Sequence, residues 1–290
     1  MQHPGKVFKE FRTGKGWSVK EAAGNSVTPQ FLRKFESGNS DIRFSTLLEL
    51  LNRINVTVTE FSCQMEDSLD HWLFQVENEL DQAYLSGNSF ALQTFITTND
   101  DRYQTTGELR YRLVAIMGMF MYDQSMSVRY NADLQPVRTY LRETETWGRF
   151  ELFLIAYLAT AMQIEESLLY ARQILKGINS DYETNMWRYD AYIHIIAQMV
   201  TQKRMDLAET LWQDYQAHFS PDRSLRYIHQ DLYGSFIHGL IKVYQGDPQG
   251  EKQCLRIIDT FALDSGYQTY ANRLNIMLYR YKAALAAAGD

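Results

Sequence analysis

From residue 66 to residue 290 the chain is a succession of segments with helical apolar spacing, separated by turn signals, and no segment stands out as rich in β-strand residues. Longer helices are predicted to begin near six residues: Leu69, Leu109, Trp147, Thr184, Ser224 and Tyr267. Shorter helices are predicted to begin between them, near Ser89, Leu134, Glu165, Met205 and Pro248. The alternation of long and short helices recurs about every 36–43 residues, the range of helical-hairpin repeats. The pattern predicts an all-α, superhelical tetratricopeptide-like repeat domain, with a plain helical bundle as the alternative.

The first sixty residues are organised differently and carry signals for four short helices. Val7, Phe8 and Phe11 have the spacing of one helix face, and Gly14 and Gly16 are natural stops for that helix. The fourth helix is predicted from an apolar stripe made of Leu47, Leu48, Leu51 and Ile54.

The two helices between them have clear starting signals. Ser18 and Glu21 fit a capping box, which predicts a helix over Val19–Ala23. Thr28 supplies an N-cap, and the proline that follows it suits the first position of a helix over Pro29–Glu36. A short helix, a turn and a second short helix within about 40 residues is the helix-turn-helix arrangement, in which the later helix enters the major groove of DNA.

Candidate DNA contacts follow from this arrangement. On the helix over Pro29–Glu36, the apolar side chains Phe31, Leu32 and Phe35 are expected to pack inward. Three residues of types that suit base reading point elsewhere, namely Gln30, Arg33 and Lys34. The candidates for phosphate contact are Lys6, Lys9, Arg12, Lys20 and Arg43. The alternative is a small helical bundle with a solvated basic face.

The charge distribution agrees with a DNA-contacting module. The net charge of the whole chain is -6, which by itself argues against nucleic-acid binding. Residues 1–60, however, hold nine basic and six acidic groups, a balance of +3 that leaves -9 for the remainder. We therefore expect a helix-turn-helix DNA-binding domain over residues 1–64 and an acidic helical repeat domain over residues 65–290.

Stacked helical hairpins create a concave surface that suits an extended peptide or a partner helix. The first helices of the predicted pairs are rich in aromatic, Arg and Asn side chains, which give contact area and hold peptide carbonyls or carboxylates. The candidate peptide-binding residues are Tyr111, Arg112, Arg149, Asn185, Arg188, Tyr192, Arg226, Tyr227, Gln230 and Tyr233. For any single tyrosine of this set, the alternative is a place in the core between helices.

Signals for catalysis and for membrane association are missing from the sequence. The six histidines and two cysteines show no metal-ligand spacing, and no common nucleotide-binding or hydrolase motif occurs. We therefore expect no enzyme activity, no catalytic residues, no metal and no cofactor, with Cys63 and Cys254 as free thiols. No apolar signal segment and no stretch long enough to span a membrane is present. The expected location is the cytoplasm.

The N-terminal sequence resembles a known family. The segment at residues 31–42, FLRKFESGNSDI, followed by the leucine-rich helix and VTVTEF at 56–61, is similar to the DNA-binding domain of the Rgg/GadR/MutR transcriptional regulators of Gram-positive bacteria. The resemblance continues at residues 147–154, WGRFELFL. It implies a Cro/C1-type helix-turn-helix, a repeat domain that binds a short signalling peptide on its concave face, and a homodimer.

The leading hypothesis is a quorum-sensing transcription regulator that binds a double-stranded operator and is controlled by a peptide pheromone, with RNA polymerase as a further partner. Two alternatives stay open. One is a helical-repeat protein-interaction scaffold, and the other is a dimeric DNA-binding regulator that needs no ligand.

Overall fold

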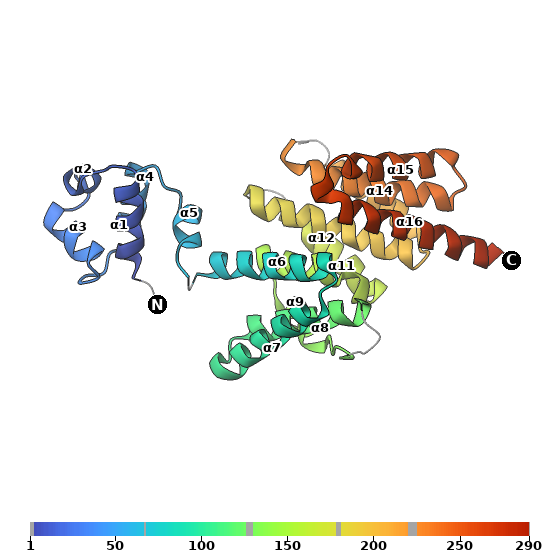
Figure 1. Cartoon of the computed structure of the whole chain (residues 1–290), viewed down its shortest axis with the longest axis horizontal. Helices are drawn as coiled ribbons and strands as arrows, with labels where there is room; N and C mark the ends of the chain where they lie inside the picture. The colour runs from blue at the N-terminus through green and yellow to red at the C-terminus, as the bar shows by residue number, and fades with distance from the viewer. Residues whose placement is uncertain (1–2, 67, 126–129, 178–180, 220–224, 290) are drawn as a thin grey trace. The chain divides into compact units, whose positions relative to one another are not determined.

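The computed structural model describes residues 3–66, 68–125, 130–177, 181–219 and 225–289 of the chain, and these residues form helices and loops without a β-strand. The chain divides into two compact units, Met1–Asp81 and Gln82–Asp290. The fold class is all-α, as the sequence predicted. Figure 1 shows the order of the helices along the chain.

The first unit contains the predicted short helices. They are α1 (Pro4–Gly14), α2 (Val19–Ala23), α3 (Pro29–Glu36) and α4 (Phe44–Arg53). A further helix, α5 (Val58–Cys63), escaped the sequence reasoning, although Thr57 and Glu60 form a capping box of the same kind as Ser18 and Glu21. The point at which the units divide lies within α6 (Leu69–Ser86).

The core of the first unit is apolar and continuous. Helix α3 packs against α1 and α2, and α4 packs against α2. Phe8 and Phe35 meet at the α1–α3 contact with their ring centroids 6.2 Å apart. The other buried side chains of this core come from α1 to α5 and from the loop between α4 and α5: Val7, Ala22, Ala23, Leu32, Leu47, Leu50, Leu51, Ile54, Val56 and Phe61. Apolar packing therefore holds the buried side of α3 against the rest of this unit.

The second unit continues with helices in pairs. They are α7 (Ser89–Thr106), α8 (Leu109–Ser125), α9 (Gln135–Glu143), α10 (Arg149–Leu158), α11 (Ile164–Leu175), α12 (Tyr182–Thr201), α13 (Met205–Phe219), α14 (Ile228–Tyr244), α15 (Pro248–Ala262) and α16 (Gln268–Gly289), with short 3₁₀ turns at Ala159–Ala161, Leu225–Tyr227 and Ser265–Tyr267. Ser224, near which a helix was predicted to begin, lies outside the described residues.

The predicted alternation of long and short helices is wrong at two pairs. Helices α6 and α7 have 18 residues each, and α10 has 10 residues against 12 in α11. Helix α10 is short because the chain tightens at Ala159–Ala161 and becomes extended at Met162. The next helix starts at once, since the Gln163 backbone N–H donates to the Glu166 side chain at 3.0 Å.

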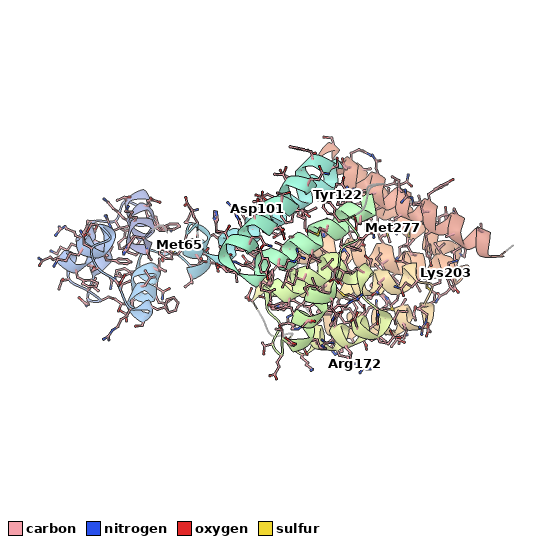
Figure 2. The ribbon with its side chains drawn as sticks, turned by 90° about the horizontal axis from the view of Figure 1, so that it is seen from below. Met65, Asp101, Tyr122, Arg172, Lys203 and Met277 are labelled. Carbon is pink, nitrogen blue, oxygen red and sulfur yellow. The ribbon has the colours of Figure 1, made fainter. Side chains whose placement is uncertain are left out.

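The pairing nevertheless gives a repeat architecture. The first helices of successive pairs pack on one another, α8 on α10, α10 on α12, α12 on α14 and α14 on α16. The second helices cover this row, with α11 on α12, α13 on α12 and α14, and α15 on α14 and α16. Figure 2 shows α7 and α8 running antiparallel, since Asp101 and Tyr122, each near the end of its own helix, lie at opposite ends of the pair. The side chain of Gln93 donates to the Tyr122 hydroxyl at 3.1 Å across this contact.

Helices α14 and α15 approach with little space between their backbones. A side-chain carbon added to Gly239 would lie 2.6 Å from the sulfur of Cys254, and one added to Gly250 would lie 2.7 Å from the carbonyl oxygen of Gly239. The Cys254 thiol donates to the Phe236 carbonyl at 3.5 Å and is fully buried. Both cysteines are free thiols, as predicted.

No helix among the described residues combines the length and the apolar composition needed to cross a membrane.

Candidate DNA-contact face and candidate peptide-contact surface

The recognition-helix candidate α3 is capped and packed on one side. The Thr28 hydroxyl accepts a hydrogen bond from the Phe31 backbone N–H at 3.1 Å. On the inner side, Leu32 and Phe35 are fully buried. The three candidates for base reading, Gln30, Arg33 and Lys34, are exposed on the other side of the helix. The structure thus brings them together on one solvent face, which we name the α3 face.

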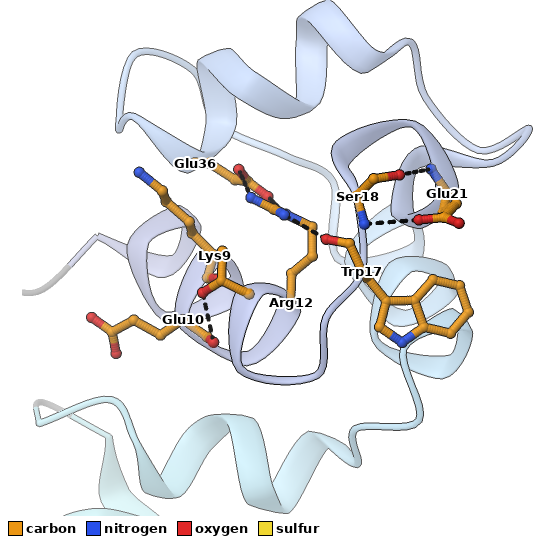
Figure 3. A network of polar contacts seen from close by, with 8 residues as sticks. Lys9, Glu10, Arg12, Trp17, Ser18, Glu21 and Glu36 are labelled. Atoms are coloured by element: carbon orange, nitrogen blue, oxygen red, sulfur yellow. Dashed lines mark hydrogen bonds and ion pairs between the residues drawn. The ribbon is translucent and has the colours of Figure 1, made fainter.

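Arg12, predicted to contact phosphate, has a different place. It is only 6% exposed, and its Nε and Nη2 donate to the two oxygens of Glu36 at 2.5 and 2.9 Å. Its Nη1 donates to the Trp17 carbonyl at 2.6 Å. Figure 3 shows the guanidinium held between these two partners. The donors of Arg12 are thus used inside the unit, so the prediction that Arg12 contacts phosphate is corrected to a structural role. Its pairing with Glu36, 24 residues away, has no local signal in the sequence.

The other candidates for phosphate contact remain accessible. Lys6 and Lys9 on α1, Lys20 on α2 and Arg43 before α4 are all exposed. Their side chains therefore satisfy the first requirement for meeting the DNA backbone.

Four of the predicted peptide-binding residues belong to the core of the second unit. Tyr192 is fully buried and packs against Tyr215 and Phe219. Tyr227 is 8% exposed and stacks on Tyr189, with ring centroids 4.5 Å apart. Both tyrosines therefore act between helices, which is the alternative that the sequence left open.

The two buried polar candidates are also occupied within the fold. Arg188 is 4% exposed, and its Nη1 donates to the Ile174 carbonyl at 2.6 Å at the end of α11. Burial lowers the pKa of Arg188, and the charge of Asp181 opposes that change. Gln230 is 4% exposed and its Nε2 donates to Asp190 Oδ2 at 3.1 Å. Arg188, Gln230, Tyr192 and Tyr227 are thus corrected to structural positions.

Five candidates keep partial exposure on first helices. The guanidinium of Arg112 is 2.9 Å from Asp100, and that of Arg149 is 2.7 Å from Glu183. The remaining three half-buried candidates are Tyr111, Asn185 and Tyr233. The side chain of Arg226 lies outside the described residues. The candidates that remain for peptide contact are Tyr111, Arg112, Arg149, Asn185 and Tyr233.

The structure adds residues that the sequence reasoning missed. Asp190 and His194 lie one turn apart on α12, and the His194 ring is 5.2 Å from the Tyr233 ring on α14. The His229 ring on α14 is 5.5 Å from the Tyr270 ring on α16. We name these residues, which join three first helices, the inner polar cluster: Asp190, His194, His229, Gln230, Tyr233 and Tyr270. The helical spacing of Asp190 and His194 was the available signal.

The environment of His194 sets the protonation of its ring. Burial lowers the pKa of His194, so its ring is uncharged at pH 7, whereas His229 is exposed to solvent. His194 Nδ1 lies 2.8 Å from the Asp190 backbone carbonyl, which can only accept, so Nδ1 carries the proton and Nε2 is an acceptor. Burial, with the nearby Tyr233 and Asp190, raises the pKa of Tyr270. His194 therefore offers a neutral acceptor next to the Tyr233 ring.

Among the described residues, no group of three His, Cys, Asp or Glu side chains is placed to hold a metal ion.

Two protein-family models match the sequence. The model described as "HTH-type transcriptional regulator Rgg, C-terminal domain" matches residues 97–272, and a helix-turn-helix model matches residues 8–61.

The fold is also that of several solved proteins. The SHP pheromone receptor Rgg2 of Streptococcus dysgalactiae is 16% identical with a TM-score of 0.74, over 96% of this chain and 99% of that chain. A putative transcriptional regulator from Listeria monocytogenes EGD-e is 17% identical with a TM-score of 0.75, over 97% and 98%. ComR from S. thermophilus, solved with DNA and its signalling peptide ComS, is 14% identical with a TM-score of 0.54, over 99% and 100%. At these identities the likeness establishes the fold.

Proposed function

Because the chain belongs to the Rgg family of helix-turn-helix transcriptional regulators, we propose that it binds a specific DNA operator through the α3 face and that a short signalling peptide controls this binding from the second unit. The members of this family are regulators rather than enzymes. The single observation that supports the DNA site best is the α3 face itself. A capped helix with a buried apolar side presents Gln, Arg and Lys together to solvent, the residue types that read base edges in the major groove.

The phosphate contacts are proposed for the exposed cations around α3. Lys6, Lys9, Lys20 and Arg43 would position the unit on the duplex, and the α3 face would read the sequence. We place the DNA-binding domain within residues 1–64, with the remaining chain as the regulatory domain.

A selection from randomised duplexes tests the DNA-binding part. Wild-type protein is expected to enrich a two-fold related sequence, and the double variant Arg33→Ala/Lys34→Ala is expected to lose preference for it. A matched control is Lys252→Ala, which removes an exposed charge from α15. Enrichment of the same sequence by the double variant would show that α3 is not the reading helix.

Peptide control is supported by two observations. Of two proteins with the same fold, one is a pheromone receptor and the other was solved in complex with DNA and its signalling peptide. In this chain, His194, Tyr233 and Tyr270 of the inner polar cluster bring hydrogen-bonding groups and aromatic rings together on α12, α14 and α16, which suits an extended peptide segment.

A retention experiment tests peptide control. Wild-type protein is incubated with a synthetic library of short hydrophobic peptides, and retained peptides are identified by mass and titrated by calorimetry. Tyr233→Ala is expected to weaken binding, whereas Tyr279→Ala, which changes an exposed residue of α16, is expected to leave it unchanged. If wild-type protein retains no peptide but still binds its selected duplex, the chain is a ligand-independent regulator.

A homodimer in the cytoplasm, with a two-fold operator, completes the proposal. The spacing between the half-sites of the selected sequence would report the dimer, because half-sites lie about one helical turn apart when two recognition helices bind the same side of DNA.

A further inference from the structure

The first turn of α1 is packed directly on the last turn of α3. A side-chain carbon added to Gly5 would lie 1.8 Å from the carbonyl oxygen of Phe35, so no larger residue fits between these helices. Arg12, two turns further along α1, binds Glu36 in the same last turn of α3. Helix α1 therefore holds the end of α3 at two separate places.

His3 reinforces the first of these places. Its Nδ1 accepts a hydrogen bond from the Gly5 backbone N–H at 3.0 Å, which caps α1 and fixes the ring. The ring meets Phe35 edge-on with centroids 5.8 Å apart and an interplanar angle of 62°. It also covers Gly38, where a side-chain carbon would lie 3.5 Å from His3 Cγ.

Gly38 and Asp41, in the loop after α3, lie next to the His3 ring. Gly38 has a φ of +78°, so it forms the left-handed turn that ends α3, and its missing side chain leaves space for the imidazole. His3 Nε2 points toward Asp41, 3.8 Å away, whose carboxylate is fully exposed. The ring thus lies across α1, the last turn of α3 and the loop that follows α3.

We propose that His3 is a positioning residue for DNA recognition: its ring clamps α1 to the end of α3 and fixes the angle at which the α3 face meets the bases. The proposal rests on the DNA-binding function proposed above. Without the ring, α1 and α3 still meet through the Arg12–Glu36 pair, Gly5 and the Phe8–Phe35 packing, but the contacts of the ring with Phe35 and Gly38 are lost, and the end of α3 gains freedom to tilt. A tilt changes the reach of base-reading side chains, whereas phosphate contacts by flexible lysines tolerate it.

Two substitutions separate the ring contact from the helix cap. His3→Asn keeps an acceptor for the Gly5 N–H and removes the ring, and His3→Phe keeps a ring over Phe35 and Gly38 and removes the acceptor. Thr57→Ala is the matched control, because it removes the cap of α5 and leaves the contacts of α1 with α3 in place.

The measurement is the ratio of dissociation constants for a scrambled duplex and for the duplex that wild-type protein selects from a randomised library. His3→Asn is expected to lower this ratio by about tenfold, the discrimination carried by roughly one base contact, while the scrambled duplex binds as before. His3→Phe is expected to keep most of the ratio despite a lower melting temperature. Thr57→Ala is expected to lower the melting temperature alone.

The opposite pattern would overturn the proposal. If His3→Asn keeps the wild-type ratio, or if the ratio follows the melting temperature through all three variants, His3 is only a helix cap. If the wild-type protein itself does not discriminate between the two duplexes, the proposed DNA-reading function fails, which is a different result from equal discrimination by wild type and variants.

Discussion

Arg12 and Glu36 form a buried, two-pronged ion pair that joins α1 to the last turn of α3 from positions 24 residues apart in the sequence. Removing one partner leaves the other charge buried, and such changes destabilise proteins by about 3–5 kcal/mol. We therefore expect Glu36→Ala to lower the free energy of unfolding of the first unit by this amount, measured by denaturant titration. Lys9→Ala, an exposed neighbour on α1, should change it by less than about 0.5 kcal/mol.

The same pair predicts a result in DNA binding. Since Arg12 is not a phosphate contact, replacing both partners by apolar residues, as in Arg12→Met/Glu36→Leu, should leave the salt dependence of DNA binding unchanged. Arg43→Ala should reduce the slope of log K against log salt by about 1. Filter-binding titrations over a range of salt concentrations measure both slopes. A lower slope for the double variant would restore Arg12 to the interface.

Tyr192 provides a stability test inside the second unit. Its side chain is fully buried, and among the described residues its hydroxyl has no hydrogen-bond partner. Tyr192→Phe should therefore raise the free energy of unfolding by up to about 1 kcal/mol, because the substitution removes an unsatisfied polar group and little volume. Thermal unfolding measures the change. A clear loss of peptide binding with unchanged stability would instead return Tyr192 to the peptide-contact surface.

The inner polar cluster predicts a loss of stability in mild acid. Burial holds the pKa of His194 below the ordinary value of 6.5 in the folded chain. Below about pH 6.5 the unfolded chain binds protons that the folded chain does not, so stability should fall as the pH is lowered. Unfolding midpoints recorded at about pH 7.5 and about pH 5.5 test this expectation.

Two variants assign the effect. His194→Gln should reduce the difference between the two midpoints, and His218→Gln, which changes an exposed histidine of α13, should not. Equal midpoints in the wild-type protein would contradict a neutral, buried His194.

The parts of the structure that the sequence predicted are those specified by neighbouring residues. Ser18 with Glu21, and Thr28 before a proline, mark helix starts within a few positions, and the structure has helices at both places. The α3 face could be predicted in the same way, because the apolar and the polar residues of this one helix lie on opposite sides. The capping box formed by Thr57 and Glu60 shows that α5 could also have been predicted from neighbouring residues.

Contacts between distant residues were not predictable in this way. Nothing in the order of residues links Arg12 to Glu36 rather than to DNA. Arg188 was expected at the surface because a buried arginine is costly, yet the carbonyl of Ile174 at the end of α11 compensates for its burial. Helical periodicity also does not show which aromatic residues of α12 face neighbouring helices. For this reason Tyr192 was predicted as a peptide contact and His194 was not.

The tight contact of α14 with α15 makes the two cysteines of the chain differ in their reactivity. Burial raises the pKa of the Cys254 thiol to about 12, and the adjoining helix leaves no room for a reagent to reach its sulfur. Cys63, at the end of α5, is only half-buried. A maleimide dye added to the native protein should therefore attach at Cys63 alone, which provides a single fluorescent label in the first unit without any engineered cysteine.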